Sequence, residues 1–314
     1  MVVRRRKIRV RRVFGLLILI LLIMGFAVSG PVMLVNIIAN RFFGEGIQIA
    51  ETESISLIRE ESDSLVQTNQ ESNISLSAVN IKDIDIEKYL MLVNRQHPVS
   101  LNLFSNFVPV WPTVPASTSR GIYLHPAALT AVEEMFNSAK NAVVGTFFIS
   151  SGYRNFDEQV ILYDNGANSA FALPPGHSEH HTGLAVDIMA VGIGMWELGN
   201  SPEGRWLANN SYRYGLILRY LQGAEHITGI EFEPWHFRYV GKIHAYYIHR
   251  HNLVLEEYIK LIQNQGGISF EKNSIIYHVL HQLPQNDIIY VPDELDFTVS
   301  ADNLGGYIIT TWER

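Results

Sequence analysis

Two short stretches hold the side chains that metal-assisted hydrolysis needs, namely residues 178–187 (SEHHTGLAVD) and residues 233–236 (EPWH). A catalytic zinc ion usually takes three ligands from His and Asp or Glu and keeps a fourth position open for water. A Glu left free beside the ion can serve as the base for that water. The two stretches predict a site for one zinc ion whose ligands are His180, Asp187 and His236, with Glu233 as the general base.

The first stretch does not identify its ligand alone, because other histidines flank the predicted one. His177 and His181 each remain an alternative to His180. Gly183 allows a tight backbone turn after the histidines, and Ala185 leaves room beneath a metal ion. The spacing therefore suits a metal site without choosing among the three imidazoles.

The second stretch is also weak when taken alone, because a Glu and a His three residues apart often occur by chance. A structural salt bridge between Glu233 and His236 is the simpler interpretation of that pair. Pro234 restrains the entry into a predicted strand, so Glu233 can face the water rather than the ion. The occurrence of both stretches in one chain favours the metal site.

Arg154 lies in a predicted turn next to Ser151 and Gly152. The simpler interpretation is a surface residue paired with Asp157 or Glu158. The functional interpretation is a guanidinium aimed at a substrate oxygen, where it would stabilise the negative charge that develops during attack.

The composition of the 314-residue chain excludes several classes of function. There is no cysteine, so a disulfide framework, a thiolate zinc site and a thiol nucleophile are all excluded. Residues 1–12 hold seven Lys or Arg and no acid, which leaves 17 basic against 31 acidic residues in the remainder. Because nonspecific nucleic-acid binding needs a basic surface, we expect no nucleic-acid partner.

The N-terminal pattern predicts a membrane anchor. Residues 13–38 form an apolar run long enough to span a bilayer, and the basic residues 1–12 before it should stay in the cytoplasm. The predicted location is the cell membrane, with a single pass and an extracytoplasmic catalytic domain. The alternative is a cleavable signal peptide with a small-residue cleavage site at residues 27–29 (AVS).

The rest of the chain divides into three predicted parts: a flexible stalk at 39–83, a catalytic domain at 84–264 and a small all-β segment at 268–314. Apolar spacing and capping residues predict helices from Pro126, after Asn155, and over 202–214 and 242–263. Strands are predicted at 146–150, 184–188, 216–220, 235–240, 275–283, 287–291, 297–300 and 307–312.

These residues closely resemble a known family. The run 151–154 (SGYR) with Gln159, then S-x-H-x-x-G-x-A-x-D at 178–187, then EPWH at 233–236 resemble the VanY-type zinc D-alanyl-D-alanine carboxypeptidases. The resemblance extends from about Tyr89 to Gln263, and the anchor and the β segment are similar to those of longer VanY proteins. It implies an α+β fold with one small antiparallel sheet flanked by helices, as in the hedgehog and DD-peptidase fold.

The resemblance also implies an activity and further site residues. The expected reaction removes the C-terminal D-Ala from peptidoglycan stem pentapeptides, and with it the group that vancomycin binds. Arg154 would polarise the scissile carbonyl, and Gln159 and Ser178 would contact the terminal D-Ala. The alternatives are an L,D-carboxypeptidase or crosslink endopeptidase on the same scaffold, or a non-catalytic wall-binding module, which an intact Glu233 disfavours.

Overall fold

The computed structural model of the chain describes residues 76–100, 105–117, 121–164, 172–313. These all belong to one of the two units into which the chain divides. The predicted anchor at 13–38 lies outside the described residues, as does most of the predicted stalk. Within the described ranges no helix is both long and apolar enough to cross a bilayer.

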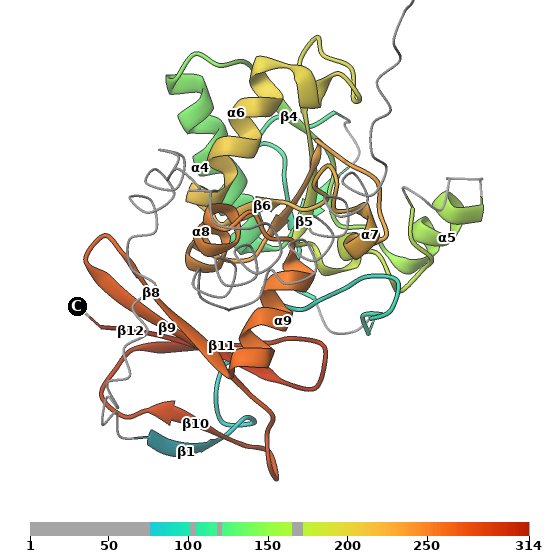
Figure 1. The fold of residues 1–314 in the computed structure, drawn as a ribbon. Coiled ribbons are helices and arrows are strands. Elements are labelled where there is room, and N and C mark those ends of the chain that lie inside the picture. The colour runs from blue at the N-terminus through green and yellow to red at the C-terminus, as the bar shows by residue number, and fades with distance from the viewer. Residues whose placement is uncertain (1–75, 101–104, 118–120, 165–171, 314) are drawn as a thin grey trace, which may run out of the picture. The chain divides into compact units, whose positions relative to one another are not determined.

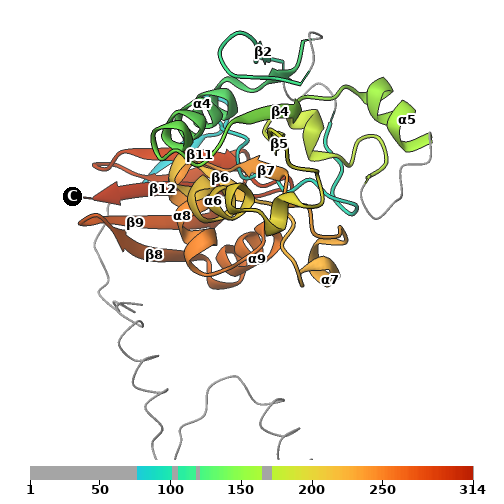
Figure 2. The same cartoon turned by 90° about the horizontal axis from the view of Figure 1, so that it is seen from above.

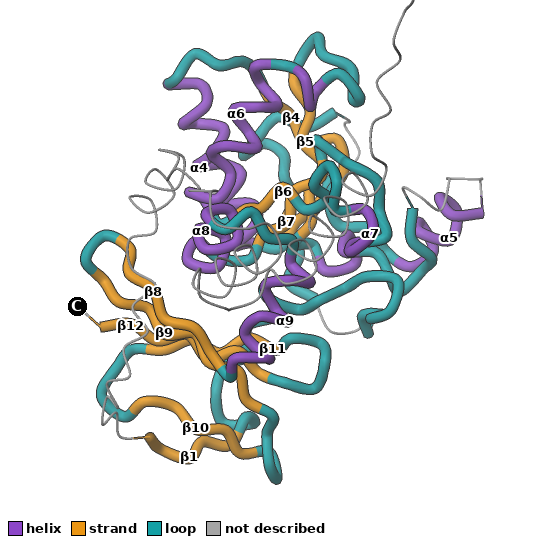
Figure 3. Tube along the Cα trace, viewed as in Figure 1, coloured by secondary structure: helices purple, strands orange, loops and turns teal. Residues whose placement is uncertain are grey.

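The catalytic part is built on a four-stranded sheet whose neighbouring strands all run antiparallel. Its strand order is β4-β5-β7-β6. Figure 3 shows these strands in orange among the purple helices of this part. The strands span Phe147–Ser151 (β4), Ala185–Ala190 (β5), Leu216–Leu218 (β6) and His236–Tyr239 (β7). The small antiparallel sheet and the α+β class are therefore as predicted.

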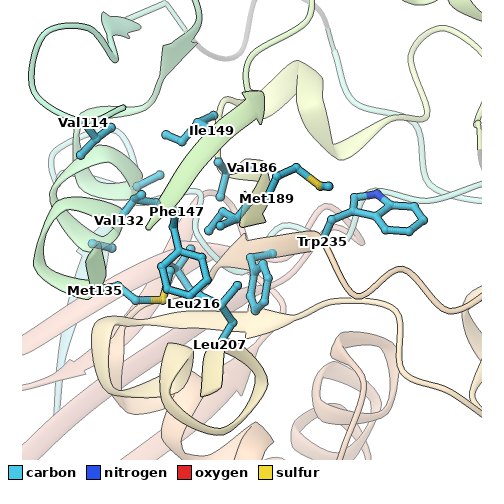
Figure 4. Packing of buried hydrophobic residues seen from close by; sticks show 14 of the residues in the cluster. Val114, Val132, Met135, Phe147, Ile149, Val186, Met189, Leu207, Leu216 and Trp235 are labelled. Carbon is cyan, nitrogen blue, oxygen red and sulfur yellow. The ribbon is translucent and has the colours of Figure 1, made fainter. Parts of the chain in front are cut away.

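One face of this sheet packs on helices α4 (Pro126–Asn141) and α6 (Pro202–Asn210). Pro126 begins α4 as predicted, because the first helical position needs no backbone donor. Figure 4 shows the shared core, to which α4, β4, β5, α6 and β6 contribute Val132, Met135, Phe147, Ile149, Val186, Leu207 and Leu216. Because side chains alternate along a strand, Val186 and Ile188 enter this core and Asp187 points to the opposite face.

The second hydrophobic core involves helices α8 (Lys242–Arg250) and α9 (Leu255–Gln265). The helical pattern predicted over 242–263 is divided between two helices, because the chain turns between them. Asn252 has a φ of 50°, which interrupts the helical backbone. Glu257 then starts α9 by accepting the backbone N–H of Val254 at 3.0 Å.

Short elements complete this part of the chain. Helix α5 (Phe156–Asp164) begins after Asn155 as predicted, and the Asn155 side chain accepts the N–H of Glu158 at 2.9 Å while Glu158 returns the bond. The remaining ones are β2 (Val108–Pro109), β3 (Tyr123–Leu124), η1 (Glu179–Thr182), η2 (Leu198–Asn200), η3 (Ser211–Tyr214) and α7 (Glu225–Thr228).

The C-terminal segment is all β among its described residues. Four strands lie side by side in the order β11-β12-β9-β8 (Figure 2). They span Gly267–Lys272 (β8), Ile275–Gln282 (β9), Phe297–Ala301 (β11) and Tyr307–Glu313 (β12). The fifth strand, β10 (Ile288–Pro292), pairs instead with β1 (Leu76–Asn80) (Figure 1).

This pairing corrects the predicted stalk, which was drawn through residue 83. Residues 76–80 form a strand, and Val79, Ile81 and Ile84 pack on a small core with Ile289. The polar composition of the stalk hid this strand, because its apolar partners lie more than 200 residues later in the sequence.

The C-terminal strands share a core with the catalytic part. Ile268, Val279 and Ile308 pack with residues of α8 and α9. Hydrogen bonds join the same strands to the entry of the catalytic part, where Leu92 N donates to Asp302 O at 3.0 Å and Leu90 N donates to Ser300 Oγ at 3.1 Å. The described β segment is thus packed against the catalytic part.

His244 of α8 gives this shared core a pH dependence. Its Nδ1 lies 2.7 Å from the Tyr258 hydroxyl and its Nε2 lies 3.2 Å from Thr310 Oγ1. Burial lowers the pKa of His244 to about 4. In the unfolded chain that pKa is about 6.5, so between these values the unfolded state binds a proton that the folded state does not. We expect the free energy of unfolding to fall by about 3 kcal/mol from this group as the pH drops from 6.5 to 4.

The measurement is urea unfolding of the full chain at a series of pH values, with His244→Gln in parallel. Glutamine keeps hydrogen-bonding groups but does not titrate, so the variant should lose this part of the slope. Equal slopes for the two proteins would contradict the prediction.

Candidate metal centre

The sheet places two of the three predicted ligands directly opposite each other. Asp187 of β5 pairs in register with His236 of β7. Side chains of such cross-strand partners on one face are close neighbours. The third ligand, His180, comes from η1, which leads into β5. Among the described residues, these three have ligand atoms that all lie within 4.8 Å of one another.

The turn before β5 is shaped to hold His180. Ser178 Oγ accepts the backbone N–H of His180 at 3.3 Å and caps η1. Gly183 ends η1 with a φ of 66°, and a Cβ there would lie 2.7 Å from the Phe107 ring. Glycine is therefore required both by the backbone angle and by the space.

The two imidazoles present different nitrogens to the site. Nδ1 of His180 lies 2.6 Å from the carbonyl oxygen of Gly152, which leaves Nε2 directed at Asp187 Oδ2, 3.5 Å away. His236 presents Nδ1, which lies 3.1 Å from Asp187 Oδ1. A hydrogen bond from the other ring nitrogen is the usual way in which a protein orients a metal-binding His.

These positions fit a zinc ion. Ligand atoms about 2.1 Å from a tetrahedral centre lie roughly 3.4 Å apart. The distances from Asp187 to His180 and to His236, 3.5 and 3.1 Å, are close to that value. Asp187 Oδ1 is buried and has no hydrogen bond among the described residues, although His236 Nδ1 is near it. Asp187 Oδ1 and His236 Nδ1 are close but not hydrogen-bonded, an arrangement that suits two ligands of one ion. His and Asp without thiolate are a donor set for catalytic zinc.

The charges around His236 also call for a cation. Burial alone would raise the pKa of Asp187, but the His180 and His236 imidazoles hold it well below its usual range. Burial would lower the pKa of His236, but the adjacent carboxylates of Asp187 and Glu179 raise it to about 9. In the absence of a metal the imidazole therefore holds a proton among carboxylates, and a bound cation takes the place of that charge.

Glu233 lies beside the ligands without joining them. Its carboxylate Oε2 is 3.6 Å from His236 Nδ1, and the residue is 5% exposed. Burial raises the pKa of Glu233 to about 7, with the nearby Asp187 adding to the effect and His236 opposing it. A carboxylate with that pKa can both take and return a proton near neutral pH.

Arg154 is partly buried and directed into the same cavity. Its Nη1 donates to Gln159 Oε1 at 2.7 Å and its Nη2 donates to Ser151 Oγ at 3.1 Å. No carboxylate of the described residues lies within ion-pair distance, so the simpler interpretation with Asp157 or Glu158 was wrong. A guanidinium held by neutral groups keeps its charge available for a ligand.

Both the oxygen and the nitrogen of the Gln159 amide bond to the protein. Besides accepting from Arg154, it donates from Nε2 to the carbonyl oxygen of Leu173 at 2.7 Å, and the side chain is buried. Gln159 lines the cavity, but this geometry suits holding Arg154 better than contacting a substrate. Ser178 also lines the cavity, and its hydroxyl retains a proton to donate.

The two alternative histidines have other partners. His181 Nε2 accepts the N–H of Gly176 at 3.0 Å, and its Nδ1 lies 2.8 Å from the carbonyl oxygen of Arg154. His177 Nδ1 lies 3.0 Å from the carbonyl oxygen of Asn94. Both rings brace loops around the site, and neither joins the ligand cluster.

A small cavity of about 90 Å³ opens over the ligands. Drug-sized ligands usually occupy about 300–1,000 Å³, so this space suits one small terminal residue. Besides the ligands, its walls include Arg154, Gln159, Ser178, Tyr220, Glu233 and Trp235.

Sequence reasoning missed a buried charge network behind the ligands. Glu179 Oε1 accepts from Arg219 Nε at 2.9 Å and from Arg238 Nη1 at 2.6 Å, and all three side chains are fully buried. The two arginines hold the pKa of Glu179 well below its usual range, although burial opposes this. The available signal was one arginine inside each of two mostly apolar predicted strands, at 216–220 and 235–240.

Comparisons with known proteins point to one family. A family model described as VanY, D-alanyl-D-alanine carboxypeptidase, matches residues 121–242, which include every predicted site residue. A D-alanyl-D-alanine carboxypeptidase of Enterococcus faecium is 38% identical over 192 residues, covering 61% of this chain and 62% of that enzyme. This chain thus spans less than two thirds of that relative's length.

Two further relatives support the same grouping. A D-alanyl-D-alanine carboxypeptidase of Enterococcus faecalis is 35% identical over 210 residues, covering 62% of this chain and 74% of that enzyme. Among solved structures, the vancomycin-resistance D,D-dipeptidase VanXYg in complex with a D-Ala-D-Ala phosphinate analogue matches with a TM-score of 0.62 at 27% identity. That match covers 76% of this chain and 99% of the other.

Proposed function

Because this chain belongs to the VanY family of D-alanyl-D-alanine carboxypeptidases, we propose that it is a zinc-dependent D,D-carboxypeptidase of peptidoglycan stem pentapeptides. The observation that carries the proposal is the position of Arg154. Its guanidinium is partly buried, has no carboxylate partner among the described residues, and lines the cavity that contains the three ligands and Glu233. A cation in that place suits a substrate oxygen that gains negative charge.

The chain's own residues have distinct parts in this reaction. His180, Asp187 and His236 would hold the zinc ion, which when bound supplies a Lewis acid that acidifies water and polarises a carbonyl. Glu233 takes a proton from the attacking water and returns it to the amine of the departing D-Ala. Arg154 donates to the carbonyl oxygen as the C–O bond forms and the C–N bond breaks.

The small cavity supports cleavage next to a chain terminus. A cavity of about 90 Å³ lined by Ser178, Arg154 and Glu233 suits a substrate chain that ends one residue beyond the scissile bond. A buried polar set discriminates strongly, because a substrate without the matching group leaves it unpaired. We therefore expect amidated termini and internal crosslinks to be rejected.

The test offers the enzyme pentapeptide, tetrapeptide, crosslinked dimer and free D-Ala-D-Ala in parallel, with mass detection of the products. Pentapeptide should lose one D-Ala and become tetrapeptide. The free dipeptide should react poorly, because binding along the longer stem supplies energy that orients the scissile bond. Preference for tetrapeptide would show that the enzyme is L,D-specific. Preference for the crosslinked dimer would show an endopeptidase, and preference for the free dipeptide would show a dipeptidase.

A second test addresses Arg154. In Arg154→Lys we expect kcat/KM on pentapeptide to fall on the order of 10²-fold, the scale for loss of one oxyanion donor. Lysine retains the charge but cannot bond Gln159 and Ser151 together while facing the substrate. Arg205→Lys, on an exposed arginine whose guanidinium donates to the Asn200 carbonyl oxygen, is the matched control. Equal activity of the two variants would contradict the assignment.

The predicted location agrees with this substrate. Stem peptides lie outside the cytoplasmic membrane, and an anchor at 13–38 would hold the catalytic part there. Protease added to intact protoplasts should digest the catalytic part, and its protection would reverse the orientation.

A further inference from the structure

The buried carboxylate of Glu179 uses its two oxygens differently. Oε1 accepts from both Arg219 and Arg238. Oε2 has no hydrogen bond among the described residues and lies 3.5 Å from Nε2 of His236, which also has none. Leaving two such atoms buried and unpaired is costly. A movement of a few tenths of an ångström would join them.

A purely structural ion pair does not explain this arrangement. Arg219 already has a bidentate partner in Glu256, with contacts of 2.7 and 2.8 Å. Arg238 also donates to the carbonyl oxygens of Tyr89 and Met91, at 3.1 and 2.9 Å. The arginines thus have other acceptors, and they meet Glu179 on one oxygen only. The other oxygen faces a metal ligand.

We propose that Glu179 is a positioning residue for the metal site, whose Oε2 accepts the Nε2 proton of His236 and thereby presents Nδ1 to the ion. Two adjacent residues then have different roles at the site, because His180 binds the ion and Glu179 orients the second imidazole ligand, His236. The two arginines hold the carboxylate through its other oxygen, Oε1. The inference rests on the proposed zinc site.

The same network joins the metal site to distant parts of the chain. Arg219 connects it to Glu256 on α9, and Arg238 connects it to the backbone at residues 89–91. That backbone is bonded in turn to the C-terminal strands through Leu90 and Leu92. The β segment therefore supports the frame on which Glu179 is held.

The experiment compares Glu179→Gln with Glu256→Gln in the full chain purified in detergent. Each substitution removes one carboxylate from Arg219, but only the first changes the partner of His236. Zinc affinity, measured by competition with a chelator, should weaken about 10- to 100-fold in Glu179→Gln and stay near wild type in Glu256→Gln. Nitrogen NMR of the His236 ring in the zinc-free chain gives a second readout, because the Nε2 signal should shift only in Glu179→Gln.

Where Glu179→Gln fails to fold, Glu179→Asp replaces it, because it keeps the charge beside the arginines while withdrawing the oxygen from His236. Its zinc affinity should weaken while the chain stays folded. Equal zinc affinities and equal His236 signals in wild type and the Glu179 variants would overturn the inference alone. Failure of the wild-type chain to bind zinc would instead overturn the proposed function.

Discussion

Removing zinc with a strong chelator should abolish release of D-Ala from pentapeptide, and added zinc should restore it. Water is not acidic enough to attack an amide at neutral pH without the ion, which lowers the water pKa to about 7. The purified full chain should bind one zinc, as metal analysis can measure. Retention of full activity after exhaustive chelation would contradict the zinc mechanism.

Single ligand substitutions sharpen this prediction. His180→Ala, Asp187→Ala and His236→Ala should each lose most of the bound zinc, because the described cluster holds no fourth ligand that could replace them. His177→Ala is the matched control, since its imidazole contacts the carbonyl oxygen of Asn94 and not the cluster. Full zinc occupancy in His180→Ala would move the ligand to His177 or His181.

The metal ligands could be predicted from sequence because their geometry is mostly local. His180 and Asp187 belong to one turn and the strand that it enters, and that strand was predicted from sequence at 184–188. The third ligand, His236, lies across the sheet from Asp187, and its strand was also predicted from sequence. A two-residue side-chain period in two paired strands is enough to bring such ligands together.

What sequence did not provide depends on contacts between distant residues. Strand β1 lies in a polar stretch and forms because β10 offers it partners, more than 200 residues away. Gln159 was predicted to contact the substrate, and the sequence did not show that its buried amide also bonds Arg154 and Leu173. One polar side chain resembles another in sequence, and only the fold decides which groups are already paired.

Glu179 shows the same limit at the metal site. It stands next to a predicted ligand, yet it drew no assignment because a Glu beside a His has no fixed meaning. Its role depends on Arg219, which directly follows β6, and on Arg238 of β7. Strand patterns with one buried Arg do signal a buried carboxylate somewhere, because a buried charge needs a partner. They do not say which one.

Among substitutions that leave zinc bound, replacing the general base Glu233 should lower the reaction rate most. Glu233→Gln keeps the size of the side chain but removes its ability to take a proton. We expect kcat on pentapeptide to fall on the order of 10²- to 10⁴-fold, the usual scale for general acid–base catalysis, while zinc content and fold stay unchanged. That loss corresponds to about 3–5 kcal/mol of transition-state stabilisation.

Glu231→Gln is the matched control, because Glu231 is exposed and two residues away on the same segment. It should retain wild-type activity. Loss of zinc in Glu233→Gln would show that Glu233 is a ligand. Its Oε2 atom, 3.6 Å from His236 Nδ1, would then share the ion with that nitrogen. Activity near wild type would mean that another group takes the proton. Because burial already raises the pKa of Glu233 to about 7, no other described carboxylate beside the ligands is as well matched to that step.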